Sequence, residues 1–161
     1  MRESTLLDLE KKYLEVQYDA VTQGYLREFC KDQGFDLSIK FDGSRQDPED
    51  FDFHTTVWFT TSEHQLANGT FACDVTATPT GFALFGEEKN VLVMEVSSDD
   101  LVQLRKEYGD EYNMQDMWPD YRPHITVCYN WSGDLPNFNP ADVLTEPLRA
   151  DRLNIKRQKK F

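Results

Sequence analysis

The chain has 161 residues, of which 39% are hydrophobic and 29% charged, a composition typical of one globular domain with its own core. Its formal net charge of −12 argues against a protein that coats DNA or RNA, because such binding depends on cations that neutralise phosphates. A small phosphate-bearing ligand remains compatible with that charge, since a few local cations can dominate the field in a cleft.

Hydropathy and cysteine usage indicate the cellular setting. No apolar run approaches the length of a membrane span, and the N-terminal segment is amphipathic rather than signal-like. The three cysteines lack the spacing of a metal site, which favours reduced thiols. We therefore expect a cytoplasmic protein that does not bind membranes, located in the host-cell cytoplasm if it is viral.

The N-terminal part of the chain has a helical pattern. Apolar side chains recur at helical spacing from Leu6 through Tyr13 to Phe29, with Ser4 as a possible N-cap and Gly34 as a possible end. This pattern predicts a helical region over residues 1–35.

The remainder alternates with the period of two that is typical of strands. One helix, over residues 97–109 with Ser98 as its cap, interrupts this pattern. An aromatic, acidic loop at 109–121 is a candidate lid, and a helical turn is predicted at 139–148. The predicted strands are 37–41, 51–60, 71–78, 81–88, 90–97, 122–131 and an edge strand at 152–157.

This order of elements predicts one α+β domain over residues 1–161, with helices packed on the outside of antiparallel sheets. Its core is expected at 37–155, followed by a basic tail at 156–161.

Two segments of the chain match each other. Residues 54–59 read HTTVWF and residues 124–129 read HITVCY, so both contain His, any residue, Thr, Val, any residue and an aromatic. Residues i and i+2 of a strand point to the same face. His54 would therefore project with Thr56, and His124 with Thr126, and we expect the two strands to be symmetry mates near the middle of the sheet.

Two imidazoles and two hydroxyls are suited to cleaving a phosphodiester. A neutral imidazole can remove a proton from the nucleophile while a protonated one supplies a proton to the leaving oxygen. Hydroxyls can donate to the non-bridging oxygens. A zinc site is a weaker interpretation, because two separated histidines without a third ligand make a poor metal set. We expect no metal and no cofactor.

A nucleobase ligand also needs flat partners for stacking. Trp58 has the strand parity of His54, Trp131 follows the second motif, and Tyr121 and Arg122 precede it. These four are candidate substrate-binding residues, although packing within the core is the simpler interpretation of each aromatic.

The paired motifs resemble those of the 2H phosphoesterase superfamily. That resemblance implies a pseudo-twofold, bilobal α+β fold and metal-independent cleavage of nucleotide phosphodiesters. The chain looks closest to the phage anti-CBASS nucleases, which degrade the cyclic oligonucleotide messengers of bacterial immunity. The shared features are His-Thr-Thr at 54–56 and Tyr-x-Pro-His-hydrophobic-Thr at 121–126, with an aromatic and a tryptophan following.

By this resemblance His54, Thr56, His124 and Thr126 form the catalytic quartet, and the substrate is a small cyclic oligonucleotide cleaved at its 3′–5′ bonds. The family also uses an acidic residue late in the chain, for which Glu146 and Asp151 are the nearest candidates. Two alternatives remain open. One is a 2H enzyme that acts on 2′,5′-oligoadenylates or RNA 2′,3′-cyclic phosphates, and the other is a protein that sequesters cyclic nucleotides without turnover. The oligomeric state cannot be read from the sequence.

Overall fold

An antiparallel sheet forms the framework of the protein in a computed structural model, which describes residues 11–61, 68–112 and 120–157. The sheet has the strand order β2-β1-β6-β3-β4-β5. Its strands are β1 (Lys11–Tyr18), β2 (His54–Thr61), β3 (Gly69–Phe85), β4 (Val91–Ser97), β5 (His124–Cys128) and β6 (Leu148–Arg157). Within the described residues the sheet is accompanied by two α-helices, α2 (Ala20–Gln33) and α3 (Asp99–Tyr112), and two short 3-10 helices, η1 (Pro48–Asp50) and η2 (Pro140–Asp142). The architecture is therefore α+β, as predicted.

Strand β3 belongs to both halves of the sheet. Its first part pairs with β6 from Gly69 to Ala77, and its second part pairs with β4 from Thr78 to Phe85. The sequence predicted two strands here, at 71–78 and 81–88. They form one strand because the irregularity between Pro79 and Gly81 bends the chain without ending the ladder, as a β-bulge does.

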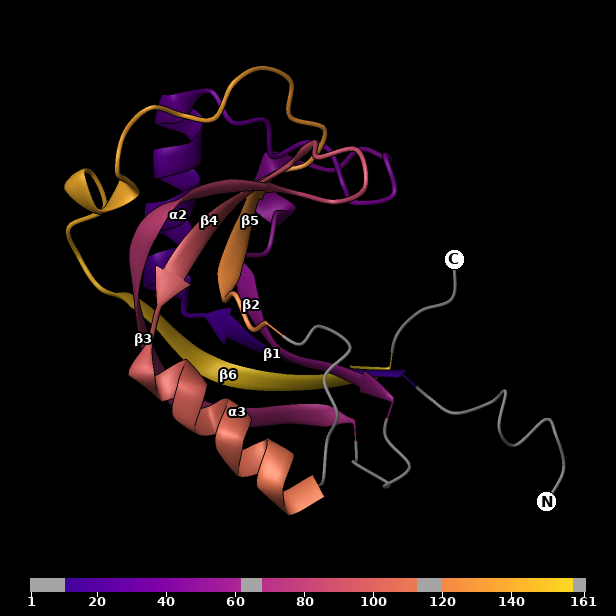
Figure 1. Cartoon of the computed structure of the whole chain (residues 1–161). Coiled ribbons are helices and arrows are strands. Elements are labelled where there is room, and N and C mark those ends of the chain that lie inside the picture. Colours follow the sequence, from indigo (N-terminus) through magenta and orange to yellow (C-terminus); the bar gives the residue numbers. More distant parts are fainter. Residues whose placement is uncertain (1–10, 62–67, 113–119, 158–161) are drawn as a thin grey trace, which may run out of the picture.

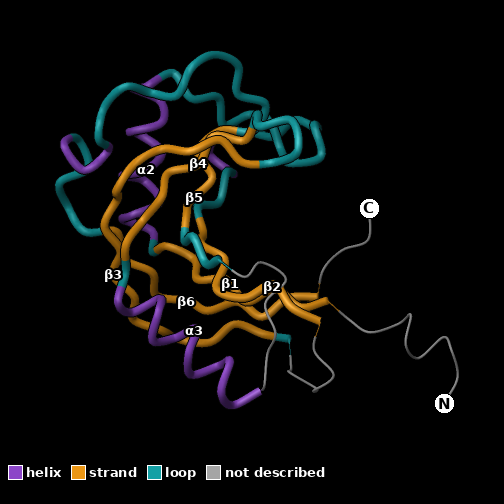
Figure 2. The backbone as a smooth tube through the Cα atoms, in the orientation of Figure 1, coloured by secondary structure: helices purple, strands orange, loops and turns teal. Residues whose placement is uncertain are grey.

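The curvature of the sheet brings its two edges together. Figures 1 and 2 show β3 curving from the layer that contains β6, β1 and β2 into the layer that contains β4 and β5. The edge strands β2 and β5 thereby come into contact. The motif strands are thus the two edges of the sheet, which corrects the expectation that they lie near its middle.

The N-terminal helical prediction is wrong for residues 11–18, which form β1. Leu14, Val16 and Tyr18 are fully buried, so their side chains repeat with a period of two. The helical interpretation failed because Tyr13 and Val16 also satisfy helical spacing over this short run. The helix begins only at Ala20, where Asp19 caps it, and Gly34 ends it in the left-handed conformation with φ 75°. Ser4 and Leu6 lie outside the described residues.

Two other predicted strands also differ from the structure. Residues 37–41 contribute only an isolated bridge from Ile39 to Arg45. The last strand is longer than predicted and interior, because β6 lies between β1 and β3. Burial of its apolar side chains on one face explains this position: Leu148, Ala150, Leu153 and Ile155 are each at most 4% exposed. The predicted basic tail begins inside β6, and residues 158–161 lie outside the described part.

Helix α3 matches its prediction closely. The Ser98 hydroxyl accepts a hydrogen bond from the Leu101 amide at 3.1 Å and donates one to the Thr76 carbonyl at 2.7 Å. This cap anchors the start of α3 on β3. Neither α2 nor α3 is long and apolar enough to span a bilayer, and the described residues contain no other helix that is. Most of the candidate lid, residues 113–119, lies outside the described residues.

Candidate active site

The two motif strands present their histidines in the same way. Thr55 and Val57 on β2, and Ile125 and Val127 on β5, are at most 1% exposed, so the alternate residues lie on the opposite faces of their strands. The alternate residues are His54, Thr56, His124 and Thr126, all partly exposed. Because β2 and β5 are in contact, the predicted quartet lies on neighbouring strands.

Both imidazoles are held by a main-chain carbonyl two residues earlier. His54 Nδ1 lies 3.1 Å from the Asp52 carbonyl oxygen, and His124 Nδ1 lies 2.8 Å from that of Arg122. A carbonyl can only accept, so Nδ1 donates in each case and carries the proton of the neutral ring. Nε2 is therefore the nitrogen of each ring that is available to exchange a proton.

The surroundings of His124 are apolar on one side and charged on the other. Its ring meets the edge of Phe85 at a centroid distance of 4.5 Å. Arg122 binds Glu95 through two contacts of 3.1 and 2.9 Å, and Glu95 lies opposite His124 on β4. Burial lowers the pKa of His124, and the charge of His54 lowers it further. The two imidazoles are thus close enough to influence each other.

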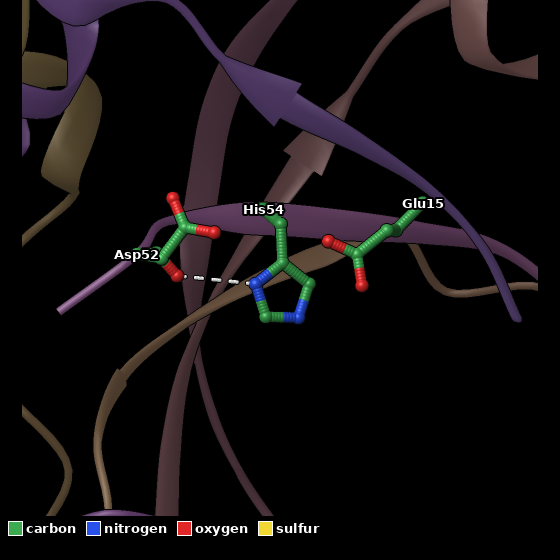
Figure 3. Close-up of side chains that lie close together, drawn as sticks. All are labelled: Glu15, Asp52 and His54. Atoms are coloured by element: carbon green, nitrogen blue, oxygen red, sulfur yellow. Dashed lines mark hydrogen bonds between the residues drawn. The ribbon is translucent and has the colours of Figure 1, made fainter. Parts of the chain in front are cut away.

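His54 has carboxylates on both sides. Figure 3 shows its ring between Asp52 and Glu15, and one ligand atom of each of the three residues lies within 4.8 Å of the others. Gln17 donates to Asp52 Oδ1 at 2.6 Å, and Lys156 forms an ion pair with Glu15 Oε1 at 3.1 Å. These are the residues that could hold a metal ion, but Asp52 and His54 Nδ1 already have hydrogen-bond partners.

The threonines differ in their contacts. The Thr126 hydroxyl forms a hydrogen bond with Tyr129, whose pKa is raised chiefly by burial. The Thr56 carbonyl accepts from the Tyr121 hydroxyl at 2.8 Å. The Tyr121 side chain, which precedes the second motif, therefore holds the main chain of the first motif in place.

Trp58 does not lie beside His54, although strand parity predicted that it would. Leu14 pairs with Trp58 and Glu15 pairs with Thr56, so β2 has an extra residue, Val57, at a β-bulge. The bulge reverses the alternation and places Trp58 in the core at 8% exposure. Its indole donates to the Arg105 carbonyl at 2.9 Å. We therefore leave Trp58 out of the proposed binding site.

The other predicted binding residues are distributed unevenly. Tyr121 is partly buried next to Arg105, whose guanidinium lies 4.3 Å from the centre of its ring, and Arg122 is exposed beside His124. Trp131 packs edge-on against Phe35 at 5.4 Å and donates to the Asp134 carbonyl at 3.2 Å. Its contacts are therefore with the core and a loop rather than with either motif.

Neither late acidic candidate has a described contact with the histidines. The Glu146 amide donates a hydrogen bond to the Tyr25 hydroxyl oxygen at 3.2 Å. Asp151 lies 3.5 Å from Arg152 Nε, at the point where the register of β6 with β1 shifts. The carboxylates that do lie near His54 are Asp52 and Glu15.

Sequence reasoning missed Glu15, Gln17 and Asn154. Asn154 donates to Gln17 at 3.2 Å, and Glu15 is paired with both Thr56 and Asn154 across the sheet. These residues share the face of His54 because directly paired residues of antiparallel strands point the same way. The alternation of Leu14, Val16 and Tyr18 was the signal that could have revealed this face.

Two His-x-Thr strands in contact at the edges of a curved antiparallel sheet are the arrangement expected from the resemblance to the 2H phosphoesterases. Comparison with known families gives the assignment within that class. The family model "Anti-CBASS protein Acb1" matches residues 10–158, and the chain belongs to this family. The match includes β1, which the predicted core at 37–155 omitted.

No curated protein matches the chain. A crystal structure of Escherichia coli LigT complexed with 3′-AMP is similar at 11% sequence identity and a TM-score of 0.46, covering 94% of this chain and 97% of that one.

Proposed function

We propose that the protein is a metal-independent phosphodiesterase that cleaves the 3′–5′ bonds of small cyclic oligonucleotides, and that it serves a virus in evading bacterial immunity. The main support is the matched pair of imidazoles. His54 and His124 are each held through Nδ1 by the carbonyl two residues earlier, which leaves both Nε2 atoms for proton transfer. Membership in the anti-CBASS family is the basis for the substrate class and the biological role.

The chemistry begins with a ribose 2′-hydroxyl next to the scissile phosphate. One Nε2 takes the proton of this hydroxyl as its oxygen attacks phosphorus, and the other gives a proton to the departing 5′ oxygen. Thr56 and Thr126 donate to the non-bridging oxygens, on which charge develops. The product is a linear nucleotide that ends in a 2′,3′-cyclic phosphate, and no metal is needed for either proton transfer.

Charge favours a small substrate over a long nucleic acid. The net charge of −12 opposes the approach of a polyanion, whose binding depends on many phosphate contacts. Arg122 beside His124 and Lys156 beside Glu15 are cations close to the motifs, each paired with a carboxylate from which a phosphate could draw it away. A substrate with few phosphates can use these local cations without meeting the wider acidic surface.

The test is incubation of the purified protein with a 3′,3′-linked cyclic dinucleotide in excess EDTA, with products resolved by chromatography. We expect linear products from the wild type, and a loss of at least about 10²-fold in His54→Ala and in His124→Ala. Circular dichroism of both variants controls for folding. Normal turnover in either variant would contradict the acid–base pair.

Two further outcomes separate the alternatives. Cleavage of 2′,5′-oligoadenylates or of RNA 2′,3′-cyclic phosphates, but not of the cyclic dinucleotide, would change the substrate class while keeping the mechanism. Tight binding of the dinucleotide with no product would identify a sequestering protein and overturn the proposed enzymatic activity.

A further inference from the structure

Asp52 is held at both its main chain and its side chain. Its carbonyl oxygen accepts the hydrogen bond of His54 Nδ1 at 3.1 Å (Figure 3), and its carboxylate accepts one from the Gln17 amide at 2.6 Å. Gln17 is the residue of β1 that pairs directly with His54. The amide that holds Asp52 therefore comes from the position opposite the imidazole, on the same face of the sheet.

Arg122 is held in the same two ways before the second motif. Its carbonyl oxygen accepts the hydrogen bond of His124 Nδ1 at 2.8 Å, and its guanidinium donates to the Glu95 carboxylate at 3.1 and 2.9 Å. Glu95 is the residue of β4 that pairs directly with His124. The two motifs therefore share one arrangement, although different side chains make it.

This arrangement matters because each imidazole is positioned only as well as the carbonyl that holds it. Neither Asp52 nor Arg122 lies within a strand, since β2 begins at His54 and β5 begins at His124. The side-chain bond from the neighbouring strand supplies a restraint at these positions. A displacement of a catalytic group by about 1 Å can lower a rate by about 10²-fold.

The bond from Gln17 is itself supported from across the sheet. Asn154 of β6 donates to Gln17 Oε1 at 3.2 Å, and Thr70 of β3 donates to Asn154 Oδ1 at 3.0 Å. Every donor in this chain is directed towards the carboxylate of Asp52, so each bond polarises the next. Asn154 is only 8% exposed. Its amide occupies the oxygen of Gln17 and leaves the nitrogen of Gln17 for Asp52.

We propose that Gln17 and Glu95 are the positioning residues of the two histidines, and that each acts through the residue two positions before its histidine. This inference rests on the proposed function, in which both Nε2 atoms must face the scissile phosphate. It is independent of which histidine is the acid and which is the base. Loosening either pair should lower kcat and leave KM nearly unchanged, because the orientation of these groups serves the reacting step.

Exchanging donor and acceptor in the first pair tests the hydrogen bond at constant charge. Gln17→Glu removes the donor and sets two carboxylates against each other, so kcat should fall about tenfold or more while KM changes less than about twofold. Adding Asp52→Asn restores a donor. The double variant Gln17→Glu/Asp52→Asn has the wild-type net charge and the same bond in the reverse direction, and it should recover most of the lost kcat.

Helix α3 offers a matched control for the first pair. Gln103 donates to Glu107 at 3.0 Å, which is also an amide–carboxylate bond, and both residues are exposed on this helix. Gln103→Glu should leave kcat and KM unchanged.

In the second motif the graded pair is Glu95→Gln and Glu95→Met. The first keeps an acceptor for Arg122 and the second keeps none, so kcat should fall further in Glu95→Met, again with little change in KM.

Nitrogen NMR of the ligand-free protein, with isotope-labelled histidine, measures ring positioning without turnover. Spectra at alkaline pH report which nitrogen of each neutral ring bears the proton, and the wild type should show it on Nδ1 of His54 and of His124. In Gln17→Glu the His54 ring alone should gain the form protonated on Nε2. In Glu95→Met the same change should occur at His124 alone.

The outcomes separate this inference from the proposed function. Unchanged ring forms in Gln17→Glu and Glu95→Met, a wild-type kcat in Gln17→Glu, or a loss that the double variant does not recover would each overturn the positioning role. A wild type that shows the expected ring forms but cleaves no dinucleotide would refute the proposed function instead.

Discussion

The hydroxyl of Tyr121 donates to the main-chain carbonyl of Thr56 across 2.8 Å. This bond joins the segment just before the second motif to the strand of the first. It is reinforced by Arg105, which stacks on the Tyr121 ring and donates to the Val57 carbonyl at 2.6 Å. The β-bulge of β2 thus has both of its carbonyls satisfied from outside the sheet.

Removing this bond should weaken both stability and turnover. Tyr121→Phe keeps the ring but leaves the Thr56 carbonyl without its donor, so we expect a loss of about 1–3 kcal/mol in the free energy of unfolding. Turnover should fall because the spacing of the motifs loosens. Urea unfolding and the rate of dinucleotide cleavage measure the two effects. Wild-type stability would show that water replaces the phenol at no cost.

The motif threonines should matter for turnover and little for folding. Thr56→Val and Thr126→Val keep the β-branched shape that suits a strand but remove the hydroxyl donor. We expect kcat to fall by about 10²-fold in each, the cost of losing one donor to a developing oxyanion. Thr78→Val, an exposed threonine on β3, is the matched control and should cleave normally.

Burial against Phe85 should determine the acidic limb of the pH–rate profile. The pKa of His124 is lowered mainly by burial, so in the role of general base it would stay neutral, and active, below its ordinary value of 6.5. If His124 is the base, the rate should therefore fall only as the pH drops below 6.5. Phe85→Ala admits water, raises the pKa of His124 and should move this limb to higher pH. A limb that stays in place would exclude His124 as the group that titrates.

Two helical glycines offer a paired stability test. A Cβ on Gly109 would meet Trp58 Cζ2 at 2.8 Å, whereas a Cβ on Gly24 would meet nothing within 4 Å. Gly109→Ala should therefore destabilise the protein by about 1–3 kcal/mol through overpacking. Gly24→Ala should stabilise it by about 0.5–1 kcal/mol through helix propensity. Thermal unfolding of both variants checks the opposite signs, and a neutral Gly109→Ala would mean that Trp58 can move aside.

The sequence predicted the α+β class and the alternation within the motif strands because His-x-Thr spacing is a local property. It did not predict that Glu15 lies near His54, since Glu15 is brought there only by the register of β1 with β2. Trp58 was misplaced for a related reason. The position of a β-bulge depends on the pairing with the opposite strand, and residues 54–61 contain no local signal that predicts it.

The position of β6 has a consequence for the order in which the protein can mature. This strand is made after both motif histidines, yet it lies between β1 and β3 and connects the half that bears His54 to the half that bears His124. A nascent chain that already contains both histidines but lacks residues 148–157 cannot form the continuous curved sheet, because the strand between β1 and β3 is missing. Such long-range pairing is slow compared with local folding. The protein should therefore gain its activity late in synthesis, in one step, when this strand is inserted.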